Sequence, residues 1–225
     1  MRRFLLLVSL LVVFCAVGYA QPLNPPCTGV TSLDNCPATG CGNGDGLLNQ
    51  KKNRTDETPD NIQTRTLAQI RAFSQPSSWT RNQSRASIAF RENRGVVVKG
   101  YLRDARSSGR ETTNCKLSGE ENNDIHLDLV SAKNAAKSTA VTAEIAPRLR
   151  KPGWDLDKLE FLGEEKYYVR VTGWYLLDSM HINNPITRAT NWEIHPVTKF
   201  EVCTLTVFKC NQGQGWVLLE DFEIP

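Results

Sequence analysis

The sequence lacks the short motifs that identify the common enzyme classes. It has no H-E-x-x-H metalloprotease motif, no G-x-S-x-G nucleophile elbow, no P-loop and no dinucleotide-binding fingerprint. Histidine is scarce, with three among 225 residues, and the formal net charge is only +3. A charge this small does not predict nucleic-acid binding. Function must therefore be argued from a few polar residues and from the organisation of the chain.

Long apolar runs are also missing after the first twenty residues. Residues 1–20 themselves have the pattern of a secretory signal peptide: Arg2 and Arg3, an apolar run from Phe4 to Val17, and a small residue, Ala20, at the expected cleavage point. The run is short for a membrane span, which needs roughly 20 residues. We therefore expect an exported protein, secreted or periplasmic, with no membrane span after cleavage.

Six cysteines follow this segment, and an even number in an exported chain is typical of disulfides. They are Cys27, Cys36, Cys41, Cys115, Cys203 and Cys210. The last two are close enough to pair locally, and one of the first three is then expected to reach Cys115. The alternative is a zinc knot, but the spacing lacks the C-x2-C pairs of structural zinc sites.

Composition divides the rest of the chain near residue 86. Residues 21–86 are rich in Pro, Gly, Asn and Asp and indicate a loop-rich, disulfide-tethered arm with one short helix over 64–73. Residues 87–225 are mainly β, with alternating or β-branched runs over 95–102, 124–129, 139–145, 167–177 and 190–197, a run over 200–208 that continues or pairs with the last of these, and one short helix over 155–162. Three strands, a helix and two further strands are the order of the OB-fold, a small five-stranded barrel. A β-sandwich is the alternative.

Histidines and acids recur at the outward positions of these strands. Strand alternation places Glu193 and His195 on one face, and Asp124, His126 and Asp128 on another. The remaining polar residues of this kind are Glu144, Asp178 and His181. In a sheet with one face in water, such residues are expected simply to be exposed or to form a structural polar network.

If these faces converge, the same residues predict chemistry. His126, His181 and His195 would be the ligands of a metal ion, with zinc the first choice, and Glu144 or Glu193 would act as the base. The reaction class would be metal-dependent hydrolysis, for example of phosphodiesters. A pair of acids beside a histidine could also act as general acid and base without metal.

The same polar residues fall within four short runs that resemble motifs of other proteins. The runs D-I-H at 124–126, E-I-A-P at 144–147, D-S-M-H at 178–181 and W-E-I-H-P-V at 192–197 resemble motifs of a group of secreted, mostly bacterial, uncharacterised proteins. The resemblance covers roughly residues 95–203 and not the cysteine-bearing arm. It implies that these polar residues belong together, and it implies no known activity.

Basic residues concentrate between residues 81 and 110. Candidate binding residues for single-stranded nucleic acid or another polyanion are Arg94, Lys99, Arg103, Arg106 and Trp192. The sequence thus leaves three functions open. The first is an exported binding or interaction module of unknown ligand with a structural His/acid cluster. The second is a metal-dependent hydrolase, and the third is a polyanion-binding protein.

Overall fold

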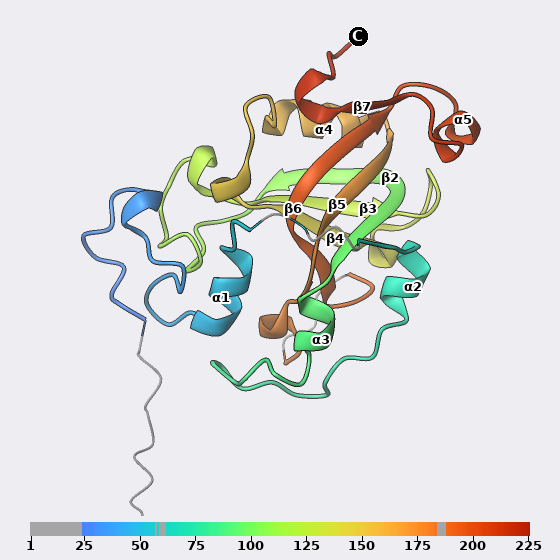
Figure 1. Cartoon of the computed structure of the whole chain (residues 1–225). Helices are drawn as coiled ribbons and strands as arrows, with labels where there is room; N and C mark the ends of the chain where they lie inside the picture. Colours follow the sequence, from blue (N-terminus) through green and yellow to red (C-terminus); the bar gives the residue numbers. More distant parts are fainter. Residues whose placement is uncertain (1–23, 57, 59–61, 184–187) are drawn as a thin grey trace, which may run out of the picture.

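The computed structural model describes residues 24–56, 58, 62–183 and 188–225 (Figure 1). The expected signal peptide over residues 1–20 lies outside the described residues. The strands are β1 (Gln63–Thr64), β2 (Gly95–Ser107), β3 (Ile125–Val130), β4 (Val141–Ile145), β5 (Tyr168–Leu177), β6 (Trp192–Cys203) and β7 (Trp216–Leu218). The α-helices are α1 (Gly46–Lys52), α2 (Leu67–Arg71), α3 (Ala89–Glu92), α4 (Leu156–Glu164) and α5 (Val207–Asn211).

Five of the strands close into a barrel. The hydrogen-bonded order is β2-β3-β4-β6-β5, and β5 pairs with β2 to complete the ring. The β4–β6 contact is parallel and the other four are antiparallel. Strands β1 and β7 add to the outside of β2 and β6. The predicted mainly β, five-stranded barrel is confirmed, and the chain does not form the alternative β-sandwich.

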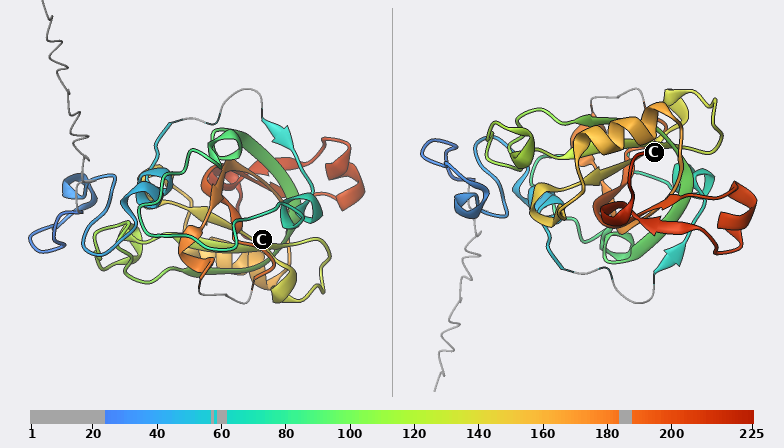
Figure 2. Two further views of the ribbon diagram at one scale, coloured as in Figure 1. Left: turned by 90° about the horizontal axis from the view of Figure 1, so that it is seen from below. Right: turned by 90° about the horizontal axis from the view of Figure 1, so that it is seen from above.

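The barrel interior is filled by the apolar residues of the alternating strands. Ile125, Leu127 and Leu129 of β3 are fully buried in the main hydrophobic core. Helix α4 packs against β2 and contributes Leu159 and Leu162 to the same core, where Figure 2 shows it lying across the upper end of the barrel. Because β3 alternates in sequence, its intervening residues must point out of the barrel.

The run over 200–208 continues the strand over 190–197, as one of the two expected alternatives, but only to Cys203, where β6 ends and α5 follows. The Thr206 side chain accepts a hydrogen bond from Lys209 N–H and so begins that helix. Helix α1 was not predicted; its first turn is capped by Asp45, whose Oδ1 accepts from Leu48 N–H at 3.0 Å. Such a short helix carries too little periodicity to be recognised in a sequence.

Three disulfides fasten the chain. Cys27 pairs with Cys41, Cys36 with Cys115, and Cys203 with Cys210. The local Cys203–Cys210 pair and the long-range bond to Cys115 are as predicted, and the alternative zinc knot is not formed. Disulfides of this number indicate a protein outside the reducing cytoplasm. Among the described residues, no helix has the length and apolar character needed to cross a membrane.

Candidate functional site

The outward polar face of β3, β4 and β6 is buried, not exposed as the sequence led us to expect. Asp124, Glu193 and His195 are 0% exposed and Glu144 is 1% exposed. The face is covered by α1 and by the loop over 111–115, both lying beside the barrel in Figure 1. Strand alternation predicted which side chains share a face, but the cover comes from segments distant in sequence.

The cover is held together by hydrogen bonds between the arm and the 111–115 loop. Thr113 Oγ1 donates to Asn49 Oδ1 at 2.7 Å, and Asn53 Nδ2 donates to Thr113 O at 2.9 Å. A backbone hydrogen bond of 3.0 Å joins Cys41 N–H to Thr112 O. The Cys36–Cys115 disulfide anchors the same loop. The arm is therefore part of the site.

Strand register brings the polar residues together. His126 of β3 lies opposite Glu144 of β4. The parallel pairing of Ala143 with Ile194 then places Glu144 beside Glu193 and His195 of β6. The predicted neighbours on alternating strand faces therefore meet across three strands.

His195 lies between carboxylates on both sides of its ring. Its Nδ1 is 2.8 Å from Glu144 Oε2 and 3.3 Å from Glu193 Oε1, and its Nε2 is 4.0 Å from Asp124 Oδ2. Burial alone would lower the pKa of His195, but the three carboxylates outweigh it and raise the pKa to about 10. Burial raises the pKa of Asp124 to about 6, against the opposing effect of His195.

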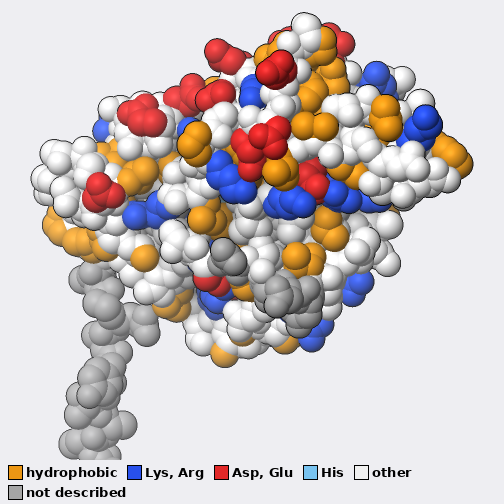
Figure 3. Space-filling view, turned by 45° about the horizontal axis from the view of Figure 1, so that its top comes forward, with side chains coloured by type: hydrophobic (Ala, Val, Ile, Leu, Met, Phe, Trp, Pro, Cys, Tyr) orange, Lys and Arg blue, Asp and Glu red, His pale blue; other side chains and the backbone are white. Residues whose placement is uncertain are grey.

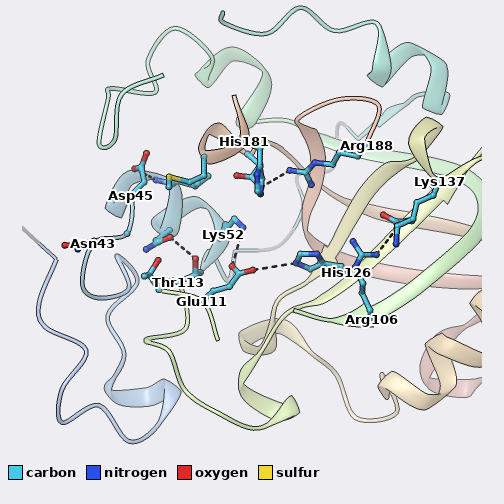
Figure 4. A pocket seen from close by; sticks show the side chains of 17 residues that line it. Asn43, Asp45, Lys52, Arg106, Glu111, Thr113, His126, Lys137, His181 and Arg188 are labelled. Atoms are coloured by element: carbon cyan, nitrogen blue, oxygen red, sulfur yellow. Dashed lines mark hydrogen bonds and ion pairs between the residues drawn. The ribbon is translucent and has the colours of Figure 1, made fainter. Parts of the chain in front are cut away.

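Lys52 and His126 connect this buried group to the pocket above it. Lys52 Nζ is 3.7 Å from Glu144 Oε2 and 3.6 Å from Glu111 Oε2, and His126 Nε2 is 3.3 Å from Glu144 Oε1. Figure 4 shows Glu111 between Lys52 and His126. Burial opposes the charged forms of Lys52 and His126, but Glu111 and Glu144 outweigh it and raise both pKa values.

A second chain of ion pairs runs through Arg188. Its Nη1 donates to Glu193 Oε2 at 2.9 Å and its Nη2 donates to Asp178 Oδ2 at 2.8 Å. His181 Nε2 lies 3.3 Å from the same Asp178 oxygen. Burial raises the pKa of Glu193, and the nearby Glu144 adds to the effect, which Arg188 only partly offsets. Arg188 therefore ties His181 at the surface to Glu193 in the interior.

These groups line a pocket of about 520 Å³ between the arm and the barrel. Its charged or polar lining includes Lys52, Arg106, Glu111, His126, Lys137 and His181 (Figure 4). On the barrel side, Arg106 and Lys137 both contact Asp128 Oδ2, at 2.8 and 3.2 Å. Asp128, 2% exposed, is therefore already neutralised by two cations.

The three predicted histidine ligands do not converge on one point. His126 and His181 line the pocket, and His195 lies beneath it. Within the described residues, the potential ligand atoms that come within 4.8 Å of one another belong to Asp124, Glu144 and His195. This is a candidate metal-binding triad in which Asp124 and Glu144 take the place of two of the predicted histidines. The D-x-H alternation was the sequence signal for Asp124.

The predicted basic binding residues do not form one surface. Arg106 lines the pocket, whereas Lys99 borders a separate groove with Arg170, and Arg103 lines a third depression. Arg94 is exposed at the beginning of β2. On the face shown in Figure 3, basic and acidic side chains lie next to one another.

Trp192 is not available to a ligand. It is 1% exposed and belongs to the main core, and its indole N–H donates to Ser74 O at 2.9 Å. The prediction that Trp192 contacts a ligand is therefore wrong in this structure, because strand alternation turns it inward beside Ile194.

Comparisons with known proteins leave the function open. No protein-family model matches the chain, and no curated protein matches it. One solved structure with a similar arrangement is that of a protein assigned as an aspartyl-tRNA synthetase from Leishmania major. It has a TM-score of 0.35 and 14% identity, with 68% of this chain and 23% of that chain covered. A likeness this distant carries no functional argument.

Proposed function

We propose that this chain is an exported binding protein whose pocket, between the disulfide-tethered arm and the barrel, holds a small polar ligand with an anionic group. One observation supports this most directly: charged side chains from the arm, the barrel and the segment around Asp178 meet at one cavity of about 520 Å³. Small-molecule pockets occupy about 300–1,000 Å³. Export is supported by the pattern of residues 1–20 and by the three disulfides.

The anionic group is inferred from the cations at the pocket wall. His181 is 37% exposed in its side chain, and His126 is 21% exposed beside Lys52. The acids nearest to Arg106 and Lys137 are already paired with them, and His181 and His126 likewise face Asp178 and Glu144. A carboxylate or phosphate on the ligand would compete with these acids for the partly exposed histidines, and hydrogen bonds to charged groups contribute about 1.5–3 kcal/mol.

Calorimetric titration with citrate and with inorganic phosphate tests this proposal. We expect at least one of these anions to bind, and His181→Ala to weaken its binding about tenfold, or about 1.4 kcal/mol. Lys99→Ala is the matched control because Lys99 is a partly exposed cation outside the pocket. Absence of binding by both anions, or equal losses in the two variants, would contradict the proposal.

A second candidate function, metal-dependent hydrolysis of a phosphodiester, is favoured by the triad directly beneath the pocket. A bound metal ion would lower the pKa of a water molecule and supply a nucleophile. Glu111, beside His126 at the pocket wall, is placed to accept a proton. Hydrolysis of bis-p-nitrophenyl phosphate that is lost with EDTA and in His126→Ala would support this candidate. Turnover unaffected by both would contradict it.

We also assign the barrel to the OB-fold type. The order β2-β3-β4-β6-β5, with α4 between β4 and β5, supports the assignment.

A further inference from the structure

Four carboxylates are buried around His195. They are Asp124, Glu144, Asp178 and Glu193, and Lys52 and Arg188 supply two of the positive charges that pair with them. Burying an uncompensated ion costs several kcal/mol. The remaining positive charge must therefore come from protonated histidines or from a bound cation.

The geometry around His195 favours the cation. Within the described chain, both ring nitrogens of His195, both carboxylate oxygens of Glu144 and Oδ2 of Asp124 are buried and make no hydrogen bond. Nδ1 lies 2.8 Å from Glu144 Oε2, an ion pair that a metal ion bound between these groups would replace. A metal ion requires donor atoms that converge and have lone pairs free to coordinate it.

We propose that Asp124, Glu144 and His195 bind one divalent transition-metal ion, Zn²⁺ or Mn²⁺, in a buried site beneath the pocket. Glu193 Oε1 also lacks a hydrogen bond and lies 3.3 Å from His195 Nδ1, but it is outside the group of donor atoms that come within 4.8 Å of one another. One imidazole with carboxylate oxygens suits Zn²⁺ and Mn²⁺, whereas the absence of thiolates from this set disfavours softer ions.

The site would also explain the burial of Asp124. Asn114 Nδ2 donates to Asp124 Oδ1 at 3.2 Å and leaves Oδ2 turned toward His195. In metal sites, a neighbouring residue typically hydrogen-bonds the carboxylate oxygen that does not bind the metal, and this orients the oxygen that does. Asn114 thus acts as a positioning residue for Asp124.

The test compares two acids on one strand segment. Asp124 and Asp128 are both buried, but only Asp124 belongs to the triad. Chelator-treated protein is titrated with Zn²⁺ and with Mn²⁺, and bound metal is measured by elemental analysis after gel filtration. We expect one ion per wild-type chain and a higher melting temperature. Asp124→Asn should bind at least tenfold more weakly, whereas Asp128→Asn should retain the ion.

Two outcomes would overturn the proposal. Wild-type protein without stoichiometric metal would mean that protonated histidines balance the carboxylates. Equal binding by the two variants would mean that the ion sits elsewhere. If Asp124→Asn does not fold, the visible absorption of Co²⁺-loaded wild type decides, because an ion coordinated by imidazole and carboxylates differs from hydrated Co²⁺. Citrate and phosphate binding are measured on the same metal-free protein, so failure of the metal site and failure of the pocket proposal are separable.

Discussion

Removing the Cys36–Cys115 disulfide is expected to lower the free energy of unfolding by about 4.5 kcal/mol. The two cysteines are 79 residues apart in sequence. The loop-closure expression, 2.1 + 1.5R ln n, gives about 15 cal/mol/K for this loop, or about 4.5 kcal/mol at 25 °C. Both cysteines are 3% exposed, so the double Cys→Ala variant also loses some packing. The bond anchors the loop that carries Glu111, and anion binding in the pocket should weaken with it.

The Cys203–Cys210 disulfide provides the matched control. These cysteines are 6% and 0% exposed but only 7 residues apart, and the same expression predicts about 2.4 kcal/mol. Loop length by itself predicts a difference of about 2 kcal/mol between the two variants. Urea unfolding of both double Cys→Ala variants measures it. Equal losses, or a larger loss at Cys203–Cys210, would refute the account of the arm as a long-range tether.

Three further predictions concern stability. The Nε of Arg85 donates to Glu92 Oε2 at 3.0 Å, and both side chains are buried. Glu92→Ala leaves the Arg85 charge uncompensated and should lower the free energy of unfolding in urea by about 3–5 kcal/mol. A loss below 1 kcal/mol would contradict this. Gly173→Ala should cost about 1–3 kcal/mol, since its Cβ would collide with a carbonyl oxygen of β6, and an unchanged melting temperature would disprove the close approach. Burial raises the pKa of Glu201, but its ion pair with Arg170 outweighs this and lowers the pKa below 4.5. The contribution of Glu201 to stability is therefore present above pH 4.5 and lost as the pH falls. Glu201→Gln should flatten the profile of melting temperature against pH in that acidic range, and a profile identical to wild type would count against the ion pair.

The barrel could be predicted because its strands alternate strongly. Ile125, Leu127 and Leu129 fill the interior as their spacing requires, and the sequence correctly places Glu193 and His195 on one face. Helix α1 could not be predicted in the same way, because it is short and its residues face a polar cluster instead of an apolar core.

The burial of the cluster could not be predicted from the sequence. It depends on Lys52, Glu111 and Arg188, which lie in the arm and in loops, and on the Cys36–Cys115 bond that holds the cover. Alternation specifies which side chains share a face of a strand, but only long-range contacts decide whether that face meets water. For the same reason, a face expected to be exposed became the most buried polar region of the barrel.

The central claim is that the cluster beneath the pocket binds a metal ion. Anomalous diffraction from crystals grown with Zn²⁺, recorded on both sides of the zinc absorption edge, tests it most directly. The account predicts one strong peak about 2.0–2.2 Å from oxygens of Asp124 and Glu144 and from a ring nitrogen of His195. Crystals whose only zinc peaks lie at exposed side chains, with hydrogen-bonded carboxylates around His195, would contradict it.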